Sequence, residues 1–140
     1  MDTKELDKAL LAIVEKKNLL STLNYNDENY DLVEEELHEL EDDFIDEYGE
    51  YLEDALGLVH EEYCPDNDVL LPIAYTANKY IKTGEKTDGT PEYSVAPNEG
   101  VIVDADDFPG KISRLVFVPN PTRLILNIEK GKSVEVWRAE

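Results

Sequence analysis

The sequence predicts an α+β fold: an N-terminal antiparallel helical hairpin with one long acidic helix, followed by a C-terminal antiparallel sheet of about four to six strands. Up to residue 63, apolar residues recur at steps of three and four, which is typical of amphipathic helices. After Pro65, short apolar runs alternate with turn residues, which is typical of strands. Helices that precede the strands, rather than alternating with them, indicate segregated layers.

Length and composition predict one folded domain. The chain has 140 residues, of which 41% are hydrophobic, and a chain of this size hides roughly 68% of its unfolded surface on folding. We therefore expect a single domain over residues 1–140. Residues 1–64 form the helical hairpin in this prediction, and residues 65–140 form the β region.

The first predicted helix covers residues 3–20. Thr3 is a suitable N-cap residue, and Leu6, Leu10 and Ile13 fall on one face at steps of three and four. A short polar connection follows at residues 21–26, so we expect the next helix to fold back against the first.

The second predicted helix is long, from Asn26 to Tyr63, with Asn26 or Asp27 as its cap. At 1.5 Å per residue it measures roughly 55 Å, so the first helix covers only about half of it. Beyond Tyr48 another element must cover it, and the β region is the candidate. Gly49 and Gly57 lie inside this helix, and either could mark a kink or a close approach. Its apolar stripe comprises Tyr30, Val33, Leu37, Leu40, Phe44, Tyr48, Leu52, Ala55, Val59 and Tyr63.

The first part of the β region gives weaker signals. Val69–Tyr75 is apolar and predicts a buried strand, although Pro72 indicates an edge or a bulge. Residues 83–100 are rich in glycine, proline and polar side chains, which predicts a flexible loop around a short strand at Glu92–Val95. Val101–Val103 predicts another short strand.

The last part of the chain gives the clearest strand pattern. The runs Lys111–Val118, Thr122–Glu129 and Ser133–Arg138 are joined by short connections, so they predict an antiparallel meander. Alternation places Leu115, Phe117 and Leu124 on one face, and Trp137 on the other.

Charge is concentrated in one window of the sequence. The net charge is −20, no lysine or arginine occurs from Asn18 to Asn78, and 19 Asp and Glu fall between Asp27 and Asp68. Such a surface repels nucleic-acid phosphates and anionic lipid, so we expect neither direct nucleic-acid binding nor membrane binding. A partner protein should be basic.

The exposed acidic face of the long helix admits two interpretations: a solvated face that keeps the protein soluble, or a docking surface for a basic protein. In the second case the protein would be regulatory, an inhibitor, or an immunity-type protein that imitates nucleic-acid phosphates. The residues expected to contact the partner are Glu35, Glu39, Asp42, Asp43, Asp46, Glu50 and Glu53. No phosphate-binding loop, Ser/His/Asp arrangement or dinucleotide fingerprint occurs, so we predict a non-enzymatic protein without a cofactor.

Two small clusters are candidate metal ligands. His60 and Cys64 share a helix face and could supply two zinc ligands. Asp104 and Asp106 resemble half of a calcium loop, but the remaining ligands of such a loop are missing. A small apolar residue at a helix end and a turn rich in aspartate are the commoner explanations of these two clusters, so we predict no metal.

Two alternative functions remain open. A small-ligand protein or enzyme would need a pocket between the long helix and the sheet, lined by Tyr48, Tyr51, Tyr63, Tyr75 and Trp137. A self-associating protein, such as a homodimer, would pair the stripe from Tyr30 to Phe44 with a second copy. A single cysteine and no signal-peptide pattern lead us to expect a cytoplasmic location.

Overall fold

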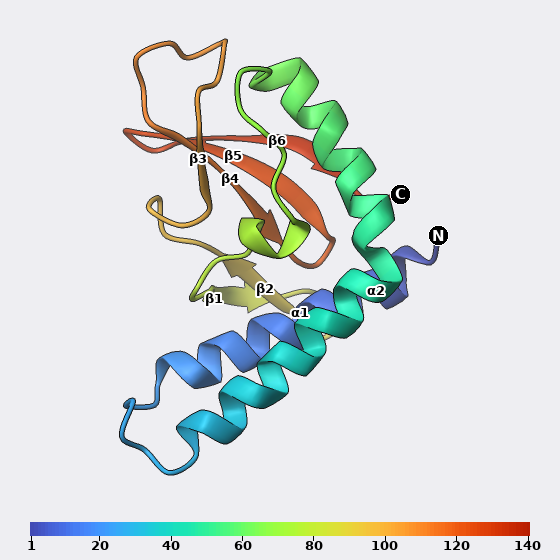
Figure 1. Ribbon diagram of the computed structural model, residues 1–140, viewed down its shortest axis with the longest axis vertical. Coiled ribbons are helices and arrows are strands. Elements are labelled where there is room, and N and C mark those ends of the chain that lie inside the picture. The colour runs from blue at the N-terminus through green and yellow to red at the C-terminus, as the bar shows by residue number, and fades with distance from the viewer.

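The computed structural model describes residues 1–140 and has an α+β architecture, as predicted (Figure 1). Two packed helices precede six strands, which form one four-stranded and one two-stranded antiparallel sheet. The elements are α1 (Thr3–Ser21), α2 (Tyr30–Tyr63), the 3-10 helix η1 (Pro72–Tyr75), β1 (Ile81–Glu85), β2 (Pro91–Ser94), β3 (Val101–Val103), β4 (Ser113–Val118), β5 (Arg123–Ile128) and β6 (Lys132–Arg138).

Both helix starts differ slightly from the prediction. The Asp2 carboxylate accepts hydrogen bonds from the backbone N–H groups of Lys4 and Glu5 at 3.0 and 3.2 Å, so Asp2 is the N-cap of α1 and Thr3 is already helical. α2 begins at Tyr30 rather than near Asn26 or Asp27. Two successive tight turns, closed by Asp27 N–H to Asn24 C=O and Tyr30 N–H to Asp27 C=O, hold residues 24–30 outside the helix.

The two helices form the predicted hairpin. α1 lies alongside the first half of α2, and α2 then continues past α1 and bends toward the four-stranded sheet near its own middle (Figure 1). Gly49 lies close to this midpoint and is buried, and a Cβ added there would approach Ile45 Cγ2 to 3.3 Å. The buried side chains of α1 are Leu6, Leu10, Ile13 and Val14.

The second half of α2 packs against η1 and β6. The rings of Tyr51 and Trp137 lie 5.9 Å apart, which joins α2 to β6. The rings of His60 and Tyr75 also lie 5.9 Å apart, edge to face, which joins α2 to η1. The prediction that another element covers α2 beyond Tyr48 is thus confirmed, although η1 was not foreseen.

The four-stranded sheet is the predicted meander, in the order β3-β4-β5-β6 with antiparallel neighbours. Leu115 pairs with Leu126 and Phe117 with Leu124, as the alternation requires. The predicted face of Trp137 is wrong. A β-bulge in β6 shifts the register between Leu124 and Ile125, so Trp137 pairs with Leu124 and its ring lies 6.3 Å from that of Phe117.

Two further predictions in the β region are wrong. Val69–Tyr75 is not a strand, because Pro72 begins a 3-10 helix and its fixed φ suits the first position of a helical turn. Residues 83–100 are not one flexible loop: β1 and β2 pair as a hairpin, closed by the Lys86 N–H to Thr90 C=O hydrogen bond of 2.8 Å. The short strand predicted at Glu92–Val95 corresponds to β2.

A single hydrophobic cluster of 23 buried residues joins the helices to the four-stranded sheet. α1 also makes polar contacts with distant parts of the chain. The Asp7 carboxylate accepts from Asn120 N–H at 2.7 Å and from the Thr122 hydroxyl at 3.0 Å, and the Asn18 side-chain oxygen accepts from Tyr80 N–H at 2.7 Å. Neither helix has a stretch apolar and long enough to cross a lipid bilayer.

Candidate functional site: the acidic face of α2 and the apolar segment at its end

The first feature of the site is a row of carboxylates along α2, which we name the acidic stripe. Its positions recur at steps of three and four, with Asp42 and Asp43 adjacent, so they share one helix face. They lie opposite the buried side chains Val33, Leu37, Phe44 and Leu52. Every member is exposed. The acidic stripe consists of Glu35, Glu39, Asp42, Asp43, Asp46, Glu50 and Glu53.

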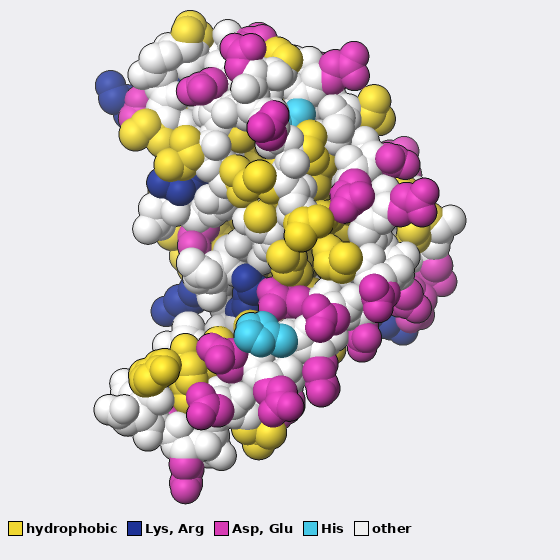
Figure 2. All heavy atoms as spheres, viewed as in Figure 1, with side chains coloured by type: hydrophobic (Ala, Val, Ile, Leu, Met, Phe, Trp, Pro, Cys, Tyr) yellow, Lys and Arg dark blue, Asp and Glu magenta, His cyan; other side chains and the backbone are white.

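No member of the acidic stripe forms an ion pair, and Lys16, which lines a shallow hollow with Glu39 and Asp43, pairs with Glu36 instead. Of the 15 Asp and Glu in α2, only Glu36 forms an ion pair, with Lys16 Nζ at 2.8 Å. The remaining ion pairs of the chain lie within α1 and the β region. In Figure 2, acidic side chains lie along α2, from the part that pairs with α1 to the part near the four-stranded sheet. The solvent face of α2 therefore carries a negative potential that is available to a ligand.

The spacing of the acidic stripe continues beyond Glu53 to Gly57 and His60, where the helix meets the chain that follows it. His60 is buried. Its Nδ1 lies 3.0 Å from the Asn67 carbonyl oxygen, and its Nε2 lies 2.8 Å from the Tyr75 hydroxyl. The Tyr75 hydroxyl also accepts from Leu70 N–H at 3.0 Å. This network fixes residues 67–75 against the end of the stripe.

An exposed apolar segment lies next to this network, and we name Val69, Leu70 and Leu71 the apolar patch. Their exposed fractions are 42, 44 and 59%. In Figure 2, hydrophobic side chains gather over the segment before η1 and over η1 itself, and Asp and Glu side chains flank them on the side of α2. This patch was not predictable from the sequence, since an apolar run indicates burial unless the tertiary neighbours are known.

The four candidate metal ligands do not form a metal site. No group of three or more His, Cys, Asp and Glu side chains comes close enough to hold an ion, and both ring nitrogens of His60 have protein partners. Cys64 is a free, fully buried thiol. Burial, reinforced by the negative charges of Asp106 and Asp104, raises the pKa of the Cys64 thiol to about 11.

Asp104 and Asp106 have backbone roles beside α2. The Asp106 N–H donates to the Tyr63 carbonyl at 2.9 Å, which satisfies an acceptor in the last turn of the helix. The Asp104 N–H donates to the Asn67 side-chain oxygen at 2.7 Å. Both carboxylates are exposed, and they raise the pKa of the Cys64 thiol through their negative charge.

The five aromatic residues expected to line a pocket are distributed along the packed side of α2. Tyr75 is 0% exposed, and its ring lies 6.2 Å from that of Phe117. Tyr48 stacks at 5.7 Å on Phe44 within α2, away from the Tyr51–Trp137 pair. Tyr63 is half-buried. None of the five lines a principal surface hollow, because those hollows lie on the hairpin and on the β region.

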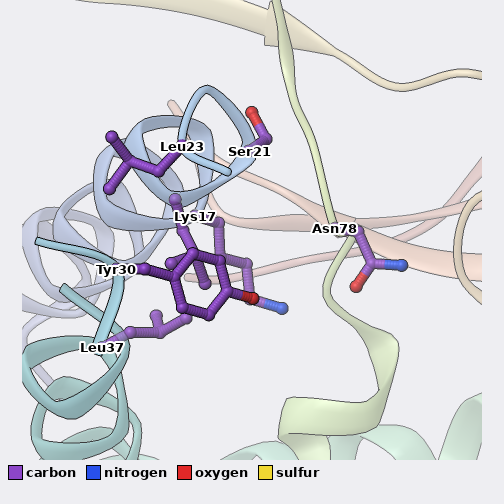
Figure 3. A pocket seen from close by; sticks show the side chains of 7 residues that line it. Lys17, Ser21, Leu23, Tyr30, Leu37 and Asn78 are labelled. Carbon is purple, nitrogen blue, oxygen red and sulfur yellow. The ribbon is translucent and has the colours of Figure 1, made fainter. Parts of the chain in front are cut away.

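One hollow, lined by both apolar and polar side chains, lies beside the hairpin and measures about 340 Å³. Figure 3 shows the side chains of Lys17, Tyr30 and Leu37 on the hairpin side, with Asn78 on the chain between η1 and β1. Lys17 Nζ donates to the Thr76 hydroxyl at 2.8 Å. Burial lowers the pKa of Lys17, and the carboxylates of Glu41 and Glu99 oppose that shift. This lysine serves as a structural contact between α1 and the segment after η1.

No protein-family model matches the chain, and no curated protein or solved structure is significantly similar to it.

Proposed function

We propose that this chain is a small, acidic, non-enzymatic protein that binds a basic protein through the acidic stripe of α2. The observation that supports the proposal is the unpaired state of all seven stripe carboxylates, on a helix where only Glu36 has an ion-pair partner. Exposed like charges three or four residues apart destabilise a helix slightly. A bound cationic partner would relieve this repulsion. The opposite charges of the two proteins would also accelerate their association.

The proposal covers regulatory, inhibitory and immunity-type roles, in which the stripe occupies the cationic surface of a target. We place this role in the cytoplasm, where a free thiol such as that of Cys64 stays reduced. Self-association through the stripe side of α2 is unfavourable, since two copies would each bring a net charge of −20.

Differential affinity capture tests this function. The stripe variant Glu39→Gln/Asp42→Asn/Asp46→Asn/Glu50→Gln removes four charges from the stripe. The matched control Glu28→Gln/Glu92→Gln/Asp107→Asn/Glu140→Gln removes four charges from exposed, unpaired positions elsewhere. We expect wild type and control to retain the same basic protein, released as salt rises, and the stripe variant to lose it. Equal retention by all three proteins, or a partner without net positive charge, would overturn the proposal.

A further inference from the structure

The apolar patch is a run of three exposed apolar side chains next to exposed acidic residues. Val69, Leu70 and Leu71 are consecutive and each is at least 42% exposed. Asp66 and Asp68 immediately precede them and are exposed. A solitary exposed leucine needs no explanation, but three adjacent apolar side chains held in one place form a surface that a partner can cover.

The patch is held in a fixed conformation by the structure beneath it. Leu70 N–H donates to the Tyr75 hydroxyl, which in turn contacts His60. The Leu71 carbonyl accepts from Ala74 N–H at 2.9 Å in the turn of η1. A partner that covers the patch therefore does not have to order this segment first, which lowers the entropic cost of binding.

The patch is continuous with the acidic stripe. From Asp46, steps of four, three, four and three lead through Glu50, Glu53 and Gly57 to His60, on which residues 67–75 are anchored. The stripe from Glu35 to Glu53 is about 27 Å long at 1.5 Å per residue. A cationic helix of similar length could follow the carboxylates and place apolar side chains on the patch at one end.

The charges around the patch determine which occupant fits. A second copy of this chain would bring its own acidic rim and a net charge of −20 to the contact, and an anionic membrane would be repelled in the same way. A segment with lysine or arginine beside leucine-like residues complements both the apolar centre and the acidic rim.

We propose that the apolar patch is the anchor site of the docking surface, and that it takes the apolar side chains of a basic amphipathic helix whose cationic face lies on the acidic stripe. This inference rests on the proposed function and makes it more specific: charge attracts the partner, and the patch provides affinity beyond charge. At most protein interfaces a few central, well-packed residues carry most of the binding energy.

The test uses the full chain and two synthetic probes with the same number of lysines: an amphipathic Lys/Leu helical peptide and an oligolysine. Affinities are measured by calorimetry for wild type, the patch variant Leu70→Ser/Leu71→Ser, the stripe variant and the control Leu58→Ser. Leu58 is 67% exposed, but it lies two residues from His60 and therefore on nearly the opposite side of α2. Leu71→Ser alone, at the most exposed position of the patch, serves if the double variant does not fold.

We expect the amphipathic peptide to bind wild type about tenfold or more tightly than the oligolysine. The patch variant should remove this preference without changing the affinity for oligolysine. Leu71→Ser alone should reduce the preference about threefold, and Leu58→Ser should leave the preference intact.

Equal affinity of the two peptides for wild type, with both weakened in the stripe variant, would overturn the anchor site but leave the proposed function standing. If neither peptide responds to the stripe variant, both proposals fail. A patch variant that changes the oligomeric state instead would assign the patch to a second copy and overturn the inference.

Discussion

The Tyr75 hydroxyl is the buried polar group that joins η1 to α2. The Asn67 carbonyl can only accept, so His60 Nδ1 carries a proton and donates to it, while His60 Nε2 lies 2.8 Å from the Tyr75 hydroxyl. Leu70 N–H supplies the second bond to the same oxygen. Burial raises the pKa of the Tyr75 hydroxyl, although the Leu70 hydrogen bond opposes that shift. Each of these polar groups has a hydrogen-bond partner. These hydrogen bonds fix the orientation of η1 against α2, which apolar contacts alone would not do.

Tyr75→Phe tests this contact without changing the volume of the core. Removing the hydroxyl leaves His60 Nε2 and Leu70 N–H without that partner, so we expect a loss of about 1–3 kcal/mol in the free energy of unfolding. Urea denaturation measures the change. The control Tyr25→Phe, at a residue 81% exposed, should stay within about 0.5 kcal/mol of wild type. A loss no larger than the control's would contradict the network.

Cys64 should behave as a protected thiol rather than a nucleophile. Its pKa is raised to about 11 by burial and by Asp106 and Asp104, so the thiol is protonated at pH 8. We expect a disulfide reagent to modify the folded protein far more slowly than the denatured protein at that pH. The same shift predicts a pH effect on stability: the contribution of Cys64 is complete below its unfolded pKa near 9 and is lost as the pH rises through about 11. Rapid, stoichiometric modification of the folded protein would contradict this account.

At the scale of single elements, α2 combines strong packing on one face with charge repulsion on the other. Carboxylates such as Glu35 and Glu39, or Asp46 and Glu50, stand four residues apart without an intervening cation. Each such pair destabilises the helix by a few tenths of a kcal/mol at low salt. The hydrophobic contacts of α2 with α1, η1 and β6 must therefore supply the stability of the helix.

Neutralising the stripe should stabilise the protein. For Glu39→Gln/Asp42→Asn/Asp46→Asn/Glu50→Gln we expect the free energy of unfolding to rise by about 0.5–2 kcal/mol at low salt, because several repulsive pairs disappear. In 1 M salt the gain should fall close to zero, because the Debye length shrinks to about 3 Å. Denaturation at both salt concentrations measures it. A variant less stable than wild type, or a gain independent of salt, would show that the stripe does not repel itself.

Gly100 controls the approach of β3 to β4. Its φ is +100°, and an added Cβ would lie 2.4 Å from the Leu115 carbonyl oxygen. Gly100→Ala should therefore lower the free energy of unfolding by about 2 kcal/mol or more. Gly110→Ala is the matched control, since Gly110 also has a positive φ of +77° but faces open space; we expect it to cost about 1–2 kcal/mol. Equal losses in the two variants would mean that backbone strain alone, and not the contact with β4, limits position 100.

Elements with strong periodicity were predictable from the sequence, and elements defined by tertiary contacts were not. α2 and the meander β4-β5-β6 follow from repeats of 3.6 and 2 residues. β1 was missed because all of its residues are exposed and show no hydrophobic alternation. The sequence predicted a strand where η1 lies, because a short apolar run around Pro72 fits a buried strand as well as a 3-10 helix.

The candidate site was predictable only in part. Helical phase placed the seven stripe carboxylates on one face, where they are all exposed. The apolar patch could not be anticipated, because its exposure depends on where residues 67–75 lie against His60. The face of Trp137 was wrong because a one-residue bulge reverses the alternation. The buried hydrogen-bond network had no sequence signal beyond the presence of His60 and Tyr75.

At the scale of the whole molecule, the helical hairpin and the β region share one core, and most of the net negative charge lies on α2, which holds 15 Asp and Glu and no Lys or Arg. Asp7 and Asn18 connect α1 to the β region, and Tyr51 and His60 connect α2 to β6 and η1. The acidic stripe is therefore presented on a helix anchored on both of its halves. A rigid, preorganised surface of one sign suits fast, charge-steered association with a basic partner.

The salt dependence of partner binding tests this account most directly. The basic protein captured with wild type is titrated against wild type, the stripe variant and the charge-matched control over a range of salt concentrations. We predict that affinity falls steeply with salt for wild type and for the control, and that the stripe variant binds weakly with a much shallower salt dependence. The same steep dependence in all three proteins, or none in wild type, would contradict the assignment of the acidic stripe as the docking surface.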